Sequence, residues 1–351
     1  MTRLESLLQE NYMQLHGEEG KNAALDYLRN HASVGHEEPV FIKKLLKVVN
    51  HILHSDPASL ETLLYKAHRF AMEGIDKIRN GHPHINPDKL PGFKSSFCMY
   101  AGDAAMAIFE KTGSISWLQM AYHNYWKSAD SVKESNEKHA AHAYSFAAKA
   151  ARIILEHIGE SKSEKLLWAE RSYNANMESI KHTLISEPIH AAHCFAFAGN
   201  AARIKFEITK DPQDAQNWYD AYEKSASKSA DVDPRHSGYA YSFAGQAARE
   251  LYKVTGKISL AEESYFAYKK SAEIISLIDP KYSSHASMFA GQIARIVYLK
   301  TNNQEWAKKA VRAYESFLKY SASNPDPKQS DLILEIKSSA AELERHIAAH
   351  H

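Results

Sequence analysis

Residues 94–327 contain a short motif that recurs five times, and this repetition constrains the fold more than any other feature of the chain. Each copy opens with Phe or Tyr and continues with small residues. The copies are Tyr100-Ala-Gly-Asp-Ala-Ala-Met106, Phe146-Ala-Ala-Lys-Ala-Ala-Arg152, Phe197-Ala-Gly-Asn-Ala-Ala-Arg203, Phe243-Ala-Gly-Gln-Ala-Ala-Arg249 and Phe289-Ala-Gly-Gln-Ile-Ala-Arg295, spaced by 46, 51, 46 and 46 residues. A fixed period of this length is typical of stacked supersecondary units, each of which buries its apolar face against its neighbours.

Within each repeat, counted from the opening aromatic residue as position 0, two helical segments are separated by a turn. The turn comes near position 13, where Gly or Asn is common, as at Gly113, Gly256 and Asn302. These residues suit the left-handed conformation that often ends a helix. The second segment carries Tyr at positions 22 and 25 and Ser-Ala at 28 and 29, a spacing that places them on one helical face. No alternating β-branched run indicates a strand.

Each unit ends near an acidic residue followed by proline, which favours a break because the residue before proline avoids helical geometry. These pairs are Glu187-Pro188, Asp233-Pro234, Asp279-Pro280 and Asp326-Pro327. We therefore predict that every repeat consists of helix A, a turn, helix B and a loop. The 51-residue spacing is explained by five extra residues in the turn that follows Gly159.

Two columns of the repeat have a predicted packing role. Small residues at Gly199, Gly245 and Gly291 let two helices approach closely, so a bulkier side chain there overpacks the contact, at about 1–3 kcal/mol. The Tyr columns of helix B, such as Tyr222 and Tyr268, are predicted to lie in the core, with each hydroxyl bonded to Ser or a carbonyl. The alternative is an aromatic surface that binds a ligand.

The pattern resembles the tetratricopeptide family. That family's Gly/Ala on helix A, its Ala-x3-Tyr and Ala on helix B and its terminal Pro correspond to Gly245, Ala261-x3-Tyr265, Ala272 and Pro280. The departure is length, since the family's unit has about 34 residues. The resemblance implies an all-α, right-handed superhelical solenoid of antiparallel helix pairs, whose A helices line a concave ligand-binding surface. The longer helices also resemble those of vesicle-fusion attachment proteins of the same superfamily.

The parts outside the array define the expected domain organisation. Residues 1–80 are predicted to be an N-terminal helical region that includes a degenerate helix pair. Residues 81–93 are rich in Pro and Gly and are predicted to be a hinge loop. The five repeats then occupy residues 94–327. Residues 328–351 carry an amphipathic pattern typical of the capping helix that a solenoid needs at its open end.

A polar ladder on helix A is the candidate binding site. Positions −4, 3 and 6 fall close together on a helical wheel, and stacking the repeats would align them. The candidate ligand-binding residues are Lys149, Arg152, His193, Asn200, Arg203, Gln246, Arg249, Gln292 and Arg295. Asn and Gln could hold a peptide backbone, and Arg an acidic group. Alternatively, Arg pairs with a carboxylate such as Glu156 or Glu207 and is structural.

The sequence gives little indication of a metal site, a cofactor site or a catalytic site. His139/His142 and His190/His193 are helical pairs at i, i+3, but no Glu completes a metalloprotease motif, so we expect no metal site. No phosphate loop, dinucleotide fingerprint or nucleophile elbow occurs, so we expect no cofactor and no catalytic residue. Cys98 and Cys194 are expected to be small buried apolar residues.

The overall composition of the chain limits the classes of partner that it is expected to bind. The formal net charge is +1, from 43 Lys and Arg against 42 Asp and Glu, which disfavours nucleic acid and membrane surfaces. No apolar stretch approaches the ~18 residues that a membrane helix needs. Two cysteines and an N-terminus that does not read as a signal peptide suit the cytoplasm.

The function expected from these observations is a non-enzymatic scaffold that binds a protein or peptide, whose identity the sequence does not reveal. One alternative is a helical-repeat enzyme or small-ligand receptor with an interior lined by His, Arg and Tyr. Another is a protein that assembles with copies of itself as a homo-oligomer. An open surface along the A helices favours the first, whereas a closed polar cavity favours the second.

Overall fold

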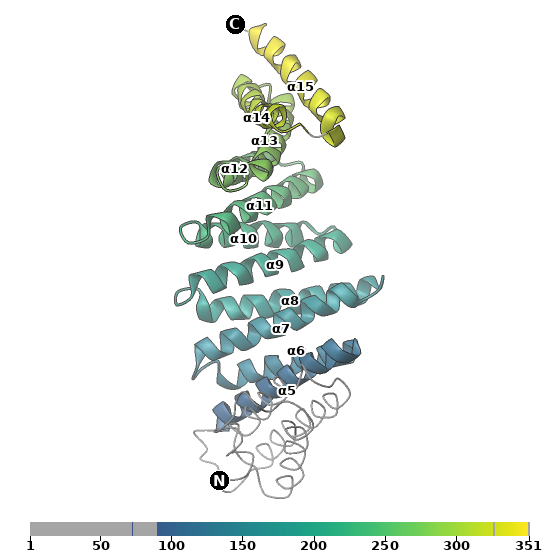
Figure 1. Ribbon diagram of the computed structural model, residues 1–351, viewed down its shortest axis with the longest axis vertical. Coiled ribbons are helices and arrows are strands. Elements are labelled where there is room, and N and C mark those ends of the chain that lie inside the picture. Colours follow the sequence, from purple (N-terminus) through teal and green to yellow (C-terminus); the bar gives the residue numbers. More distant parts are fainter. Residues whose placement is uncertain (1–71, 73–89, 326, 350–351) are drawn as a thin grey trace, which may run out of the picture. The chain divides into compact units, whose positions relative to one another are not determined.

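The computed structural model describes residues 72, 90–325 and 327–349, and in these residues all regular structure is helical (Figure 1). The α-helices are α5 (Leu90–Thr112), α6 (Ile115–Val132), α7 (Glu137–His157), α8 (Lys162–Thr183), α9 (Pro188–Thr209), α10 (Pro212–Ser229), α11 (Pro234–Thr255), α12 (Ile258–Ile275), α13 (Pro280–Thr301), α14 (Gln304–Ser323) and α15 (Ser330–Ala348). A short 3-10 helix, η2 (Pro327–Gln329), precedes α15. The predicted all-α solenoid of antiparallel helix pairs is confirmed for the described residues.

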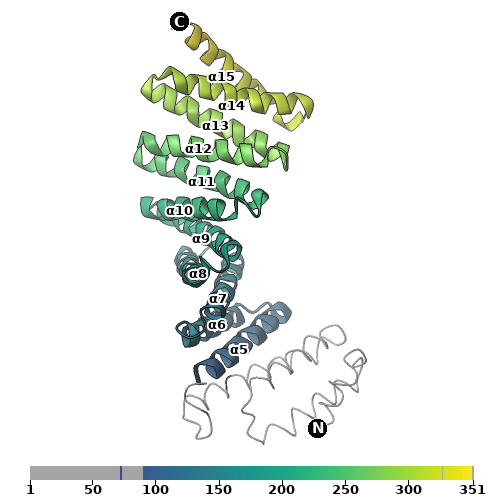
Figure 2. The same cartoon turned by 90° about the vertical axis from the view of Figure 1, so that its left-hand side faces the viewer.

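The chain divides into two compact units after Gly159. In the first unit, α5 packs on α6 and α6 on α7. In the second, each helix from α8 to α14 packs on the helix that follows it in the chain, as Figure 2 also shows for α11 to α14. The unit boundary falls in the turn of the second repeat, between its helix A (α7) and its helix B (α8).

The N-terminal boundaries need one correction. Helix α5 already begins at Leu90, so residues 90–93 are not part of the predicted hinge loop 81–93. A proline such as Pro91 is tolerated in the first turn of a helix, where its missing N–H would be unsatisfied anyway. The rest of that loop and the predicted region 1–80, apart from Met72, lie outside the described residues.

The acidic residue and proline that close one repeat also open the next helix A. Asp233 and Asp279 are N-caps, and their carboxylates accept backbone N–H groups of His236 and Tyr282 at 3.0 Å. The following prolines occupy the first helical position, where a fixed φ favours the helix. Pro188 begins α9 in the same way, although Glu187 makes no side-chain capping bond.

The predicted left-handed helix ends occur in four of the five repeats. Gly113, Lys210, Gly256 and Asn302 have φ between 54° and 70°. In the second repeat, helix α7 instead ends at an extended Ile158.

The five inserted residues of the second repeat lie mostly in helix, not in the turn. Helix α8 has 22 residues, whereas α6, α10 and α12 have 18 each.

A close contact between Gly of helix A and Tyr of helix B recurs within the units. A Cβ atom added to Gly102, Gly199, Gly245 or Gly291 would lie within 2.9 Å of a ring atom of the Tyr at position 25 of the same repeat. Only glycine leaves room for that ring. The predicted packing role of Gly199, Gly245 and Gly291 is therefore confirmed.

The Tyr columns belong to the core, as predicted. Tyr125, Tyr222, Tyr268 and Tyr314 of position 25 are buried, as are Tyr122 and Tyr265 of position 22, whereas Tyr219 is half-buried. The expected hydroxyl partner was wrong in the first repeat, because Tyr125 donates to the Asp103 carboxylate at 2.8 Å and not to Ser or a carbonyl.

The predicted C-terminal cap is helix α15. It buries Ile336, Ala340 and Leu343 and keeps charged residues on its other sides. Helix α15 takes the place that helix A of a sixth repeat would occupy after α14, and so covers the end of the array.

The glycine contact yields a first prediction. Replacing Gly199 by Ala forces the new methyl group against Tyr222, and we expect the free energy of unfolding to fall by about 1–3 kcal/mol. The loss should exceed the gain in helix propensity of about 1 kcal/mol. Urea denaturation followed by circular dichroism measures the change.

The matched control is Gly92→Ala in α5, where an added Cβ meets nothing within 4 Å. This variant should be as stable as the parent or slightly more stable. Equal stability of Gly199→Ala and the parent would show that the Tyr222 ring moves freely and that the contact does not limit packing.

Candidate functional site

The candidate site in the second unit is the surface formed by α9, α11 and α13, the A helices of repeats three to five. We define this A-helix surface by the side chains at positions −4, 0, 3 and 6. They are His193, Phe197, Asn200 and Arg203 on α9, Tyr239, Phe243, Gln246 and Arg249 on α11, and His285, Phe289, Gln292 and Arg295 on α13. All twelve retain solvent exposure, so sequence reasoning selected an accessible surface.

A row of phenylalanines lies along this surface. Phe197 and Phe243 are 47% and 39% exposed, which is unusual for such large apolar side chains, and Phe289 is half-buried. Two of the three rings pack on a buried tyrosine, because Phe243 lies 5.0 Å from Tyr222 and Phe289 lies 5.4 Å from Tyr268 between ring centroids. In these two repeats the buried Tyr of one repeat supports the Phe of the next.

Successive A helices make side-chain contacts along this surface. The Tyr239 hydroxyl on α11 donates to Asp279 at 2.8 Å, and its ring meets Tyr282 at 4.6 Å. Further along the helices, the Arg249 guanidinium lies 5.6 Å from the centre of the Phe289 ring. Each of these contacts joins an α11 residue to a residue three to six positions earlier in the next repeat, so α11 and α13 are neighbours on this surface, while the alignment of equal positions into a ladder stays a prediction.

The arginines of the ladder are held by neighbouring carboxylates. Arg203 donates to Glu207 at 2.7 Å and to Asn200 at 3.0 Å, so the predicted pair with Glu207 is present. Arg295 pairs with Glu342 of the capping helix at 3.1 Å.

Arg249 is less well satisfied. It pairs with Glu250 at 3.3 Å, and its Nε is buried without a hydrogen-bond partner among the described residues. These contacts give the Arg column a packing role, while Gln246 and Gln292 beside it remain half-buried.

Two candidates, Lys149 and Arg152, are on α7 in the first unit. Lys149 is exposed, and Arg152 donates to Glu156 at 2.5 Å, the other pair predicted from the sequence. Exposed pairs at i, i+4 contribute only about 0.3–0.5 kcal/mol, so this contact orients Arg152 more than it stabilises the helix.

A column of serine–histidine hydrogen bonds was missed in the sequence. The Ser at position 28 of a repeat bonds a His that lies eleven residues later, at position −7 of the next repeat. The Oγ to Nε2 distances are 3.4 Å for Ser128–His139, 3.1 Å for Ser179–His190 and 2.9 Å for Ser225–His236. Ser128 and Ser225 also donate to a backbone carbonyl of the preceding helix A, which ties three helices together. The recurring spacing of eleven residues was the available signal.

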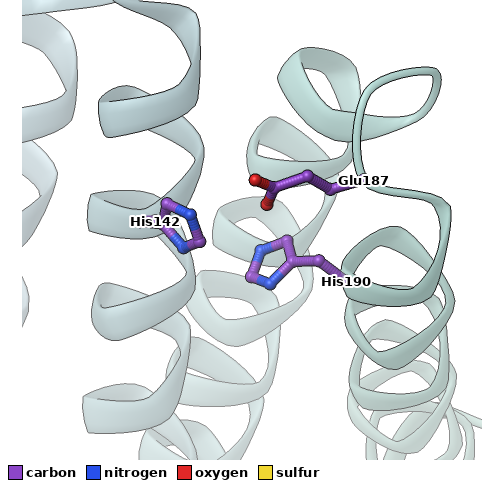
Figure 3. Close-up of side chains that lie close together, drawn as sticks. All are labelled: His142, Glu187 and His190. Carbon is purple, nitrogen blue, oxygen red and sulfur yellow. The ribbon is translucent and has the colours of Figure 1, made fainter.

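The histidines at the start of α9 have different surroundings. Figure 3 shows Glu187, the N-cap residue that precedes α9, and His190 in the first turn of that helix; the third side chain drawn there, His142, belongs to α7 in the first unit. His190 lies 3.5 Å from the buried thiol of Cys194 as well as close to Ser179. His193 is exposed and meets the His236 ring edge-on, with 4.6 Å between ring centroids.

The electrostatics of the described residues favour neutral side chains at the buried positions. Burial raises the pKa of the Cys98 and Cys194 thiols to about 11, so both are protonated near neutral pH and are poor nucleophiles. Burial also raises the pKa of Tyr222 and Tyr268 to about 12, against the opposing effect of Arg203 and Arg249. These groups can pack and donate hydrogen bonds.

Comparisons with known proteins give only remote likenesses. No family model matches the chain, and no curated protein matches it. Among solved structures, a signal transduction ATPase with a tetratricopeptide repeat sensor from Pyrococcus horikoshii aligns at 14% identity and a TM-score of 0.35. The alignment covers 98% of this chain and 56% of that protein, so the chain spans little more than half of its length.

A circular tandem repeat protein aligns at 12% identity and a TM-score of 0.36, covering 98% of this chain and 86% of that one. No function passes from these proteins to this chain. Separately, no helix among the described residues is long and apolar enough to span a membrane.

The half-buried His236 predicts a pH dependence of stability. Burial lowers the pKa of His236, with a further lowering by His193 that outweighs the opposing effect of Asp233. Above the unfolded-state value near 6.5 both states are neutral and nothing is lost. As the pH falls below it, the unfolded chain binds the proton first, so stability decreases until the folded-state pKa is passed.

We therefore expect the parent to lose more stability than His236→Gln between pH 8 and pH 5.5, as measured by urea midpoints at each pH. His193→Gln should reduce the loss less, because it removes only the second cause. An identical pH dependence in the parent and His236→Gln would contradict the lowered pKa of this half-buried histidine.

Proposed function

We propose that this chain is a non-enzymatic scaffold that binds a protein or peptide through the A-helix surface of α9, α11 and α13. The observation that carries the proposal is the set of phenylalanines on this surface: Phe197 and Phe243 are exposed, and Phe243 and Phe289 pack on buried tyrosines. Large apolar side chains exposed together on one surface are a feature of interaction sites. Rigid aromatic anchors bind with little loss of side-chain entropy.

The polar residues beside this row suit a peptide main chain. Asn200, Gln246 and Gln292 recur at one position per helix, and each amide can both donate to and accept from a backbone. The three arginines on this surface are already paired with carboxylates. The net charge of the surface is therefore closer to zero than the arginines alone would give. We therefore expect a partner that contributes apolar side chains and backbone N–H and C=O groups without hydrogen-bond partners of their own. An acidic segment is expected to fit this surface less well.

The buried, unactivated thiols support the non-enzymatic part of the proposal and a reducing compartment such as the cytoplasm. The partner remains to be identified. A second copy of this chain is one candidate, and affinity capture from the native cell, with mass spectrometry, is the direct way to find it.

Two triple variants test which column binds. Changing Asn200, Gln246 and Gln292 to Ala should reduce the amount of captured partner at least about tenfold, which corresponds to a loss of about 1.4 kcal/mol of binding free energy. The melting temperature should hardly change. Changing Arg203, Arg249 and Arg295 to Ala should instead lower the free energy of unfolding by about 1–2 kcal/mol in sum, because ion pairs and packed stems are lost.

The matched control replaces three amides of helix α10, Gln213, Gln216 and Asn217, by Ala. This variant should capture the same proteins as the parent. If capture survives the Asn/Gln variant and also survives Phe197→Ala with Phe243→Ala, the A-helix surface is not the binding site.

A further inference from the structure

A second cluster of aromatic residues lies on the B helices and surrounds one lysine. Tyr265 and Phe266 come from α12, and Trp306 and Lys309 from α14. The Lys309 ammonium is 3.7 Å from the centre of the Trp306 ring, 5.4 Å from that of Phe266 and 5.6 Å from that of Tyr265. All three distances are within the range of about 6 Å in which a cation interacts with an aromatic ring.

The three rings stand roughly perpendicular to one another. The interplanar angles are 83° for Tyr265–Trp306, 72° for Tyr265–Phe266 and 66° for Phe266–Trp306. Such rings present their electron-rich faces to a common point instead of stacking on each other. The geometry is that of an aromatic cage, the arrangement that recognises quaternary ammonium groups.

Packing of the repeat explains part of this cluster but not Phe266. Tyr265 is buried and belongs to a column that recurs in other repeats, and Trp306 is buried as well. Phe266 is 53% exposed, so the fold gains little from burying it. The other repeats carry polar residues at its position, namely His123, Asn174, Asp220 and Arg312. An exposed phenylalanine where the repeat otherwise places polar groups completes the third wall of the cage.

We propose that Tyr265, Phe266 and Trp306 form a binding site for a quaternary ammonium group, and that Lys309 occupies this site when no ligand is present. Lys309 lies three residues after Trp306 on the same helix face, and its flexible stem lets the ammonium move into solvent.

A primary ammonium group from another molecule would not bind these rings better than Lys309, which is already held beside them by its own helix. A quaternary ammonium loses less hydration on entering the cage and places methyl groups against the ring faces, so it can displace Lys309. Such groups occur in trimethylated lysine and in choline headgroups. This site is on other helices than the A-helix surface and does not depend on the proposed scaffold function.

Choline is the probe, because 3,3-dimethyl-1-butanol is its neutral isostere. We would follow the indole N–H signal of Trp306, assigned with Trp306→Phe, in ¹⁵N-labelled protein during titration with each compound. The parent should bind choline weakly, and Lys309→Ala about tenfold more tightly, because the competing cation is gone. Lys309→Met, which keeps the stem, should show the same gain if Lys309→Ala is unstable. The neutral isostere should not bind.

The controls separate the cage from general effects of charge. Lys308→Ala removes the adjacent lysine, which pairs with Glu305, and should bind choline as the parent does. Phe266→Ala should abolish binding in both the parent and the Lys309→Ala background. The melting temperature of Phe266→Ala should stay close to that of the parent, because this side chain is mostly exposed.

Three results would overturn the proposal: no binding of choline by Lys309→Ala or Lys309→Met, equal binding of choline and its neutral isostere, or no response of the parent at any choline concentration. A peptide with trimethyl-lysine and vesicles of phosphatidylcholine then identify the source of the ligand. Tighter binding of the peptide than of choline indicates a modified protein, and co-sedimentation with the vesicles indicates a lipid headgroup.

Discussion

The contact between Gly of helix A and Tyr of helix B is the interaction on which the repeats depend. Because the glycine has no side chain, the tyrosine ring lies directly against the backbone of helix A, as Tyr222 does at Gly199. The other face of that ring then supports Phe243 of the next repeat. This one glycine therefore sets the distance between the two helices of its own repeat. It also helps to set the position of helix A of the next repeat. The second repeat differs at both positions, with Ala148 for the glycine and Asn176 for the tyrosine, as expected if the two must change together.

This packing also generates the candidate binding surface. A phenylalanine supported by a buried tyrosine leaves part of its ring accessible to solvent, and this arrangement occurs at Phe243 on α11 and at Phe289 on α13. The charged residues nearby are neutralised within a turn or by the next helix, as Arg203 is by Glu207 and Arg295 by Glu342. What remains accessible is aromatic and amide in character. The surface that the fold produces is thus suited to apolar anchors and main-chain hydrogen bonds.

Much of this arrangement could be predicted because it recurs. Five copies of a motif reveal which positions are small, aromatic or polar, and helical geometry then places them on faces. The Gly and Tyr columns and the pairs of Arg152 and Arg203 follow from that. The start of α5 could not be predicted, because Pro and Gly in residues 81–93 favour a loop as well as a first helical turn. The Ser–His bonds were missed because they join different repeats. Such contacts depend on the stacking distance, which composition does not reveal.

Residues that depart from the repeat pattern can indicate a function, once their packing within the fold has been accounted for. Tyr282 replaces the histidine of the Ser–His column, and Ser271 is consequently buried without a hydrogen-bond partner among the described residues, a cost of about 1–3 kcal/mol. That departure is offset within the fold, because Tyr282 packs on Tyr239 and its hydroxyl forms a hydrogen bond with Ser242. Phe266 departs from its column with less compensation, because it packs on Tyr265 and Trp306 while 53% of its surface remains exposed. Where a residue breaks the repeat and stays mostly exposed, an interaction with another molecule is the better explanation.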